Sequence, residues 1–289
     1  MTPTRPLPRA ALNAYVTAHH EIPNQPASVF YATTVTAREL TDTELGIQVA
    51  GKVPEPIQRT WHRPLTYPSV SGNPEVALGE VAQRYANCDR CHLSERRTKV
   101  VIFRGSPHSP VVFLADGPSK VDDAYGYSMS GPDGKLEEKL LESSGIRLGS
   151  VGWITLVGCR PCDNRFANDR MPNIVEKAAC SERTLMLFRA LRPSVVVCLG
   201  AEPTSMFLKE PPPPWTWTTL DCGVVVGHAR HPAYLLRRLG VQGGEAERVA
   251  ALNFYGALRD RMPHLTKLPS WPVSVDYLSK FADGRIATH

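Results

Sequence analysis

Short apolar runs that alternate with helical patterns constrain the fold of this chain more than any other feature. Four such runs have the length and composition of buried strands, at 111–114, 151–157, 194–199 and 223–227. Helical patterns lie between and after them, most clearly at 135–143, 174–191 and 245–261. Strands alternating with helices are typical of a parallel sheet covered on both faces. The sequence therefore predicts an α/β fold: a three-layer α/β/α domain around a central, mostly parallel, four-stranded sheet.

The chain is expected to divide into three parts. Residues 1–73 are rich in proline and contain a β-prone stretch at 28–36, so they predict either an extended arm or appendage or a flexible tail. Pro74 marks a helix N-terminus, and the main domain is expected to run from 74 to 262. Residues 263–289 are expected to be a C-terminal tail.

Three polar loops follow strands of the predicted sheet. Asp116 comes directly after the first strand, the stretch 155–165 closes the second, and His231 follows the fourth. The carboxyl ends of parallel strands share one edge of a sheet, where ligands usually bind. We therefore expect the functional site at this edge.

Composition sets broad limits on compartment and partners. The 289 residues carry a formal net charge of +5, which is compatible with a polyanionic partner but does not identify one. No apolar run reaches the length of a membrane span, and the N-terminus lacks the apolar core of a secretory signal. Seven cysteines are then expected to be reduced thiols. These features predict a cytoplasmic monomer without membrane association, in the host cytoplasm if the protein is viral.

Four cysteines form two distant pairs. Cys88 and Cys91 make a C-x2-C, and Cys159 is followed by Cys180 in a helical stretch. Four thiolates suit a [4Fe–4S] cluster or a tetrahedral zinc ion. The alternative is that Cys159, Cys162 and Cys180 are small buried residues.

Several motifs together resemble the iron–sulfur, family 4 branch of the uracil-DNA glycosylase superfamily, between about residues 85 and 237. That branch has a C-x2-C, then G-E-G/A-P-G after a strand, G-x-P-F-V-G, C-R-P-P-x-N-R, a further cysteine and H-P-A-Y-L-L. The corresponding stretches here are Cys88 to Cys91, A-D-G-P-S at 115–119, G-Y-S-M-S-G at 126–131, C-R-P-C-D-N-R at 159–165, Cys180 and H-P-A-Y-L-L at 231–236.

The resemblance implies that Cys88, Cys91, Cys159 and Cys180 hold a structural [4Fe–4S] cluster. Cys162 stands where the family has its second proline and is left outside this set. The spacer from Cys159 to Cys180 is longer than in the family, which keeps Cys162 as an alternative ligand.

The resemblance also implies a pocket for a flipped-out pyrimidine nucleotide. Cleaving the glycosidic bond requires a hydrogen-bond donor beside the base O2 and an acid or oriented water near the sugar C1′. His231 matches the first role, and Asp116 replaces the family glutamate in the second. Gly117 and Pro118 are expected to line the base pocket. The alternatives are an ordinary surface histidine and a turn-capping aspartate.

Two substitutions set this pocket apart from the family pattern. Met129 replaces the base-stacking phenylalanine and gives a softer apolar wall. Thr155 replaces the asparagine that reads the uracil edge, and one hydroxyl cannot supply the paired donor and acceptor of an amide. We therefore expect weak or absent uracil excision and a different target, such as a bulkier modified pyrimidine.

Basic and apolar residues around His231 predict contact with DNA. Arg230, Arg237 and Arg238 flank the segment, which approaches the minor groove in the family. Leu235 or Leu236 is a candidate wedge into the base stack.

The leading hypothesis is a DNA glycosylase-like hydrolase that flips a modified pyrimidine and cleaves its N-glycosidic bond, in DNA repair or DNA modification. A first alternative is a transferase that modifies a hypermodified thymine of viral DNA through the same pocket. A second is a non-catalytic DNA-binding module that keeps the cluster.

Overall fold

The computed structural model describes residues 31–34, 69–238 and 242–271. Most of the expected N-terminal arm and the end of the C-terminal tail lie outside these ranges. The described strands are β1 Tyr31–Thr34, β2 Lys99–Gly105, β3 Val111–Ala115, β4 Gly152–Thr155, β5 Val195–Leu199, β6 Thr216–Thr219 and β7 Val225–Ala229. The described α-helices are α4 Pro74–Tyr85, α5 Lys120–Tyr125, α6 Pro132–Ser143, α7 Ile174–Leu191, α8 Ala201–Ser205, α9 Pro232–Arg238 and α10 Gly244–Arg261. Three short 3-10 helices are η1 His92–Glu95, η2 Leu148–Ser150 and η3 Met262–His264.

The strands form one sheet in the order β1-β2-β4-β3-β5-β7-β6. The four central strands β4, β3, β5 and β7 run parallel, as the sequence predicts. The antiparallel strands β2 and β1 extend one edge, and the antiparallel strand β6 extends the other. These edge strands were not part of the expected sheet. β6 (TWTT) lacks the apolar run of a buried strand because it lies at an edge, where its residues are only partly covered.

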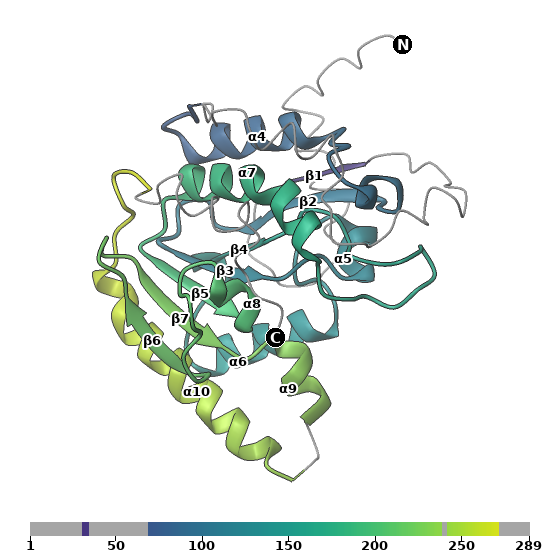
Figure 1. Ribbon diagram of the computed structural model, residues 1–289. Helices are drawn as coiled ribbons and strands as arrows, with labels where there is room; N and C mark the ends of the chain where they lie inside the picture. Colours follow the sequence, from purple (N-terminus) through teal and green to yellow (C-terminus); the bar gives the residue numbers. More distant parts are fainter. Residues whose placement is uncertain (1–30, 35–68, 239–241, 272–289) are drawn as a thin grey trace, which may run out of the picture.

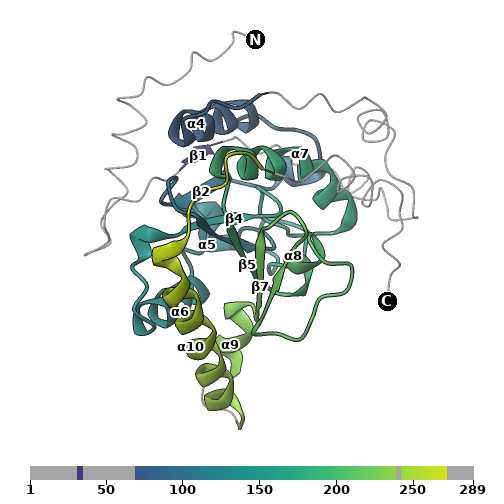
Figure 2. The ribbon, with the colours of Figure 1, turned by 90° about the vertical axis from the view of Figure 1, so that its left-hand side faces the viewer.

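Helices cover both faces of the sheet, which confirms the three-layer α/β/α arrangement (Figure 1). Along β3, Val112 and Leu114 pack toward α4 and α7, whereas Val111 and Phe113 pack toward α6 and α10. Side chains of a strand alternate between faces, so a strand buried on both must be apolar at every position. Figure 2 shows the same two helical layers from the side.

Helix boundaries follow their capping residues. The Asn73 side chain accepts hydrogen bonds from the first turn of α4, directly before Pro74. Asn173 and Glu176 form a reciprocal capping box at the start of α7, which spans the residues that the sequence predicts. Within the described ranges, no helix combines the length and apolar character needed to cross a membrane.

Buried Arg183 joins α7 to the sheet beside the functional edge. Its side chain is 1% exposed. It donates to the carbonyl oxygens of Val101 and Ile102 in β2 and, at 3.0 Å, to that of Thr155 in β4. A buried carbonyl group that loses its donor and gains no water lowers the stability of the folded protein.

Replacing Arg183 with methionine is expected to lower the free energy of unfolding by about 3 kcal/mol, because the apolar chain keeps the volume but donates no hydrogen bond. Urea denaturation measures this. Arg147→Met, at an exposed position, is the matched control and should change stability by less than about 0.5 kcal/mol. Equal effects of the two substitutions would contradict the role given to Arg183.

Candidate functional site

The loops that carry Asp116 and His231 both lie at the carboxyl ends of the parallel strands. They follow β3 and β7, and β5 lies between those two strands. β5 is followed by Gly200, whose φ of +113° favours glycine. The Gly200 N–H donates to the carbonyl of Ala229 at 2.8 Å, and a Cβ at this position would lie 3.8 Å from Cβ of His231. The turn after β5 therefore packs closely under the His231 loop.

Asp116 is partly buried, and its Oδ1 atom is covered without a hydrogen-bond partner among the described residues. Burial raises the pKa of its carboxyl group, the carboxylate of Glu202 adds to the shift and the ammonium group of Lys177 opposes it, and the resulting pKa is about 7. A buried acid that titrates near neutral pH is typical of functional sites. A turn cap accepts a backbone N–H with a side-chain oxygen, and Oδ1 accepts none from the described residues, which favours a functional acid.

One ring nitrogen of His231 is engaged by the backbone. Its Nδ1 accepts a hydrogen bond from the backbone N–H of Ala233 at 3.2 Å, so the proton of the neutral ring is on Nε2. Burial lowers the pKa of the imidazole, with Asp133 opposing this and Arg237 adding to it. At neutral pH the ring is therefore uncharged and offers an Nε2–H donor.

Met129 is held in a fixed, left-handed backbone conformation. Its φ is +58° and its side chain is 4% exposed. Nη1 of Arg104 donates to the Met129 carbonyl at 2.6 Å, while the Arg104 guanidinium lies over the Trp153 ring and pairs with Glu138. A Cβ at Gly134 would lie 1.9 Å from the Met129 carbonyl oxygen, so α6 can approach this turn only with glycine there.

Thr155 lies at the end of β4, beside Ala115 of β3, the residue before Asp116. Its side chain is fully buried, and its hydroxyl group donates to the carbonyl of Val157 at 2.7 Å. The single donor of the hydroxyl is thus used within the protein. Only its lone pairs remain for a ligand.

Gly117 permits close packing of two loops. A Cβ at this residue would lie 2.8 Å from Cγ2 of Val157 and 2.9 Å from Cγ of Pro161. The Asp116 loop therefore rests against the loop that follows β4. Pro118, the next residue, is buried.

Asp122 is a positioning residue that the sequence interpretation missed. It is 3% exposed and accepts hydrogen bonds from the backbone of Ser119 and from both the backbone and the hydroxyl group of Ser130. It thus ties the Asp116 loop to the turn that carries Met129. The capping-box spacing from Ser119 to Asp122 is the sequence signal that could have found it.

The two leucines of α9 point in different directions. Leu235 is 4% exposed and belongs to the core beneath the helix, whereas Leu236 is 39% exposed. Of the two expected wedge residues, Leu236 is therefore the one available to contact DNA.

The three arginines around His231 differ in how far they are engaged. Arg230 pairs with Glu247, with its Nε atom 3.0 Å from Oε1. Arg238 donates to the carbonyl of Gln242, and Arg237 is exposed. Arg237 is thus the most accessible of the three to a phosphate.

The four expected ligand cysteines are brought together by the packing of α4 on α7. Burial raises the pKa of the Cys91 thiol, and the thiols of Cys180 and Cys159 raise it further. Burial raises the pKa of Cys159 to about 12, with contributions from Cys180 and Cys88. These mutual effects place the four thiols near one another. Across the described ranges, however, no group of three or more His, Cys, Asp or Glu side chains is arranged to hold a metal ion.

Cys162 lies apart from these four thiols. It is fully buried, and burial raises the pKa of its thiol, while the main opposing influences are the guanidinium groups of Arg160 and Arg96. Its surroundings are thus arginines rather than other cysteines.

Two buried arginines face the thiol cluster. Arg97 is 1% exposed, and its Nη1 atom lies 3.4 Å from Sγ of Cys159. Its Nε atom and that of Arg183 are buried without a hydrogen-bond partner in the described part of the chain. Neutral thiols do not balance two buried cations, whereas thiolate ligands would. The four cysteines and the two arginines beside them therefore fit a metal group that is bound by thiolates.

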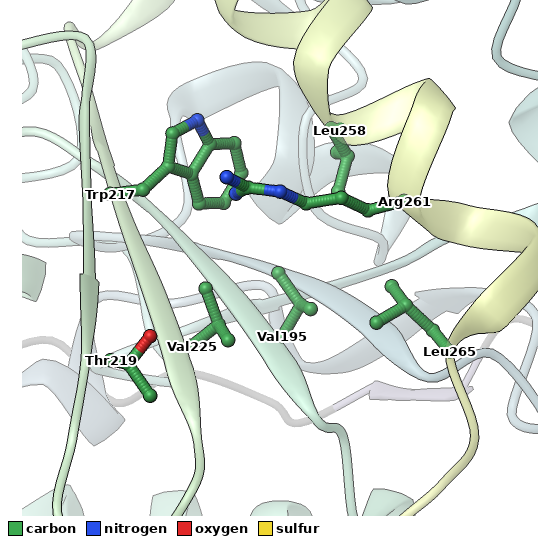
Figure 3. Close-up of a pocket in the computed structure, with 7 residues that line it drawn as sticks. All are labelled: Val195, Trp217, Thr219, Val225, Leu258, Arg261 and Leu265. Carbon is green, nitrogen blue, oxygen red and sulfur yellow. The ribbon is translucent and has the colours of Figure 1, made fainter.

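A separate pocket lies at the other ends of the parallel strands, where the strands begin (Figure 3). It has a volume of about 320 Å³, and Val195 and Val225, the first residues of β5 and β7, contribute to its lining. Arg261 extends from α10 across the Trp217 ring, 5.3 Å from its centroid. Because Asp116 and His231 follow the other ends of the strands, this pocket is distinct from their site.

Comparison with known proteins gives consistent similarities. A family model described as the uracil DNA glycosylase superfamily matches residues 102–253. The chain is similar to the type-4 uracil-DNA glycosylase of Thermotoga maritima, with 34% identity over 171 residues, 56% of this chain and 85% of the relative. Its similarity to the type-4 uracil-DNA glycosylase of Archaeoglobus fulgidus is 32% over 124 residues, 43% of this chain and 60% of that protein. The corresponding Saccharolobus solfataricus protein is 29% identical over 134 residues, 46% of this chain and 60% of its own length.

Proposed function

The chain belongs to the uracil-DNA glycosylase superfamily, and on that premise we propose that it is a DNA glycosylase that hydrolyses the N-glycosidic bond of a flipped pyrimidine. The observation that carries this proposal is that a partly buried acid with a raised pKa and a neutral histidine both follow the carboxyl ends of parallel strands. In the reaction the bond between C1′ and the base nitrogen breaks, its electron pair stays on the base, and water adds at C1′. The products are an abasic site and a free base.

His231 is assigned to the leaving base. Negative charge develops on the base O2 as the bond breaks, and an Nε2–H donor at that position stabilises it more in the transition state than in the ground state. A neutral ring is sufficient for this role, in agreement with the lowered pKa of the imidazole. Removing one such donor typically costs about 10²–10³ in rate.

Asp116 is assigned to the sugar and the attacking water. Its carboxylate can accept a hydrogen bond from water and stabilise positive charge on the sugar ring. Its Oδ1 atom has no protein hydrogen-bond partner in the described part of the chain, so this oxygen is not already engaged by the fold. The carboxylate form is required, and the raised pKa makes this form a minority below neutral pH.

The hydrogen bond of Thr155 supports weak recognition of the uracil edge. The Watson–Crick edge of uracil presents a donor, N3–H, and an acceptor, O4. The Thr155 hydroxyl already donates to Val157, so it can accept from N3–H but cannot donate to O4. Met129 adds an adaptable apolar wall. Together these residues favour a modified pyrimidine in DNA, with Arg237 and Leu236 contacting the strand.

The mutual proximity of Cys88, Cys91, Cys159 and Cys180 supports these residues as ligands of a [4Fe–4S] cluster. In such a cluster each thiolate binds a different iron, so the four thiols surround the cluster rather than converge on one ion. Buried Arg97 and Arg183 would balance the negative charge of the thiolates. When bound, the cluster cross-links α7 with the segments that follow α4 and β4. A monomer acting in the cytoplasm stays a prediction from the sequence.

An oligonucleotide panel tests the proposed function. Strands carrying uracil, hydroxymethyluracil or a bulkier thymine derivative are incubated with the protein and assayed for abasic sites and for base mass. We expect abasic product from a modified pyrimidine at a rate at least about tenfold above that from uracil, because the adaptable Met129 wall can pack against an added 5-substituent, whereas the contact missing at O4 is missing for every base of the panel. Thr155→Asn should move the preference back toward uracil.

The alternative functions give different products in the same assay. A changed base mass without base loss would indicate a transferase, and DNA binding without either product would indicate a non-catalytic module. Excision of uracil at the rate of the modified bases would contradict the preference that we attribute to the Met129 wall.

A further inference from the structure

An exposed aromatic ring stands on the loop between β4 and α7. Phe166 is 93% exposed, and Met171 and Ile174 of the same segment are 53% and 41% exposed. In Figure 1 this loop extends outward beside α5. A single exposed apolar residue is ordinary on a protein surface, whereas three within nine residues make this segment a candidate contact surface.

The backbone around Phe166 is nevertheless held firmly. The Arg160 guanidinium, 3% exposed, donates to the carbonyls of Arg165 and Ala167 and pairs with Asp169. The Asn164 side chain accepts hydrogen bonds from the backbone N–H groups of Phe166 and Ala167 at 2.9 and 2.8 Å. The carbonyls on both sides of Phe166 and its own N–H are therefore all fixed, which presents the ring in one orientation of the backbone.

The loop is also fixed to the Asp116 loop. The close packing of Pro161 at Gly117 joins them at one point, and Asp169 joins them at another by accepting from the backbone N–H of Lys120 at 3.0 Å. Phe166 is thus carried on a segment whose position is coupled to that of Asp116.

The charged side chain of this loop that is left without an ion-pair partner among the described residues is a positive one. Asp163 pairs with Arg170, and Asp169 pairs with Arg160. Arg165, next to Phe166, is exposed and has no ion-pair partner among the residues described here. An aromatic ring beside an unpaired guanidinium matches the chemistry of a nucleic acid strand, which offers base faces and phosphates.

We propose that Phe166 stacks on a DNA base that loses its neighbour when the target nucleotide flips out, while Arg165 contacts the adjoining phosphate. This inference rests on the proposed function, because it requires DNA at the Asp116 edge. In an intact duplex every base face is covered by its neighbour, so the ring finds a partner only where the stack is open. The loop would then approach the DNA separately from Leu236 on α9.

Binding to two duplexes tests this assignment. The full-length protein is titrated with an intact duplex and with the same duplex carrying a stable abasic analogue in place of one nucleotide. Phe166→Ala should weaken binding to the abasic duplex about tenfold, equivalent to about 1.4 kcal/mol, and leave binding to the intact duplex within about threefold. Phe166→Trp should restore the affinity because it keeps an aromatic face. Val249→Ala, at an exposed position on α10, is the matched control and should change neither affinity.

The outcomes separate this inference from the proposed function. Excision activity together with equal abasic-duplex affinities of wild type and Phe166→Ala would overturn the stacking role and leave the glycosylase proposal standing. Equal losses on both duplexes would also overturn it, since they would indicate general strand contact. A wild-type protein that neither binds DNA nor excises a base would overturn both.

Discussion

Cys180→Ala is expected to yield a protein that no longer retains iron after purification and that unfolds far more easily than the wild type. Cys180 lies on α7 and is assigned to the cluster with Cys88, Cys91 and Cys159. Without one thiolate the cluster loses an iron ligand, and the cross-link between α7 and the segments after α4 and β4 is lost with it. Loss of a structural metal group belongs to the largest class of single-residue effects, above about 4 kcal/mol.

Cys162→Ala is the matched control for this experiment. Cys162 is buried like Cys180, but its thiol lies among arginine side chains. The substitution removes one small buried group, so iron content should be unchanged and stability should fall by no more than about 1.5 kcal/mol. Iron analysis, visible absorbance and thermal denaturation of both variants give the comparison.

Three results would contradict the proposed ligand set. Iron lost from Cys162→Ala but kept by Cys180→Ala would show that the longer spacer has shifted the fourth ligand. Zinc in place of iron in the wild-type protein would exclude the cluster. Unchanged stability of Cys180→Ala despite loss of iron would remove the cross-linking role.

The central sheet could be predicted from the sequence because its strands are buried on both faces. A run such as Val111–Ala115 must be apolar at every position, and this leaves a clear signal. The edge strand β6 could not be found in this way, since its residues are only partly covered. β2 is equally apolar along most of its length, but it precedes the strand–helix alternation and runs antiparallel to β4. Pattern alone does not show how such a run pairs.

The sequence predicted those site residues whose place follows from their position after a strand. It could not predict roles that depend on hydrogen bonds formed in the folded chain. Asp116 and His231 stand directly after parallel strands, so topology alone brings them to one edge. The sequence cannot show that the hydroxyl of Thr155 is already engaged by Val157, because that depends on how the chain turns after β4. Burial likewise distinguishes Leu235 from Leu236, which the motif leaves equivalent.

Asp116→Asn is expected to lower the single-turnover rate of base excision by about 10²–10⁴-fold, because an amide cannot take the place of the carboxylate beside the sugar. Asp116→Glu keeps a carboxylate and should retain a larger part of the activity. Asp221→Asn removes the same charge from the exposed turn before β7, at the opposite edge of the sheet, and should leave the rate unchanged. A rate for Asp116→Asn equal to that of this control would show that the acid is not part of the reaction.

The pH dependence of excision gives the same assignment an independent test. Burial and the Glu202 carboxylate raise the pKa of Asp116 to about 7, with Lys177 opposing. The active carboxylate form therefore predominates only above that pH, so the rate should rise about tenfold per pH unit below it and level off above it. DNA phosphates near the carboxyl group would move the midpoint upward.

The effect on stability has the opposite sign: the folded protein holds this proton more tightly than the unfolded chain, so the contribution of Asp116 to stability is lost as the pH rises through about 7. If unfolding caused the loss of activity at low pH, stability would have to fall as the pH falls. Measuring excision and stability across the same pH range therefore distinguishes unfolding from protonation of Asp116.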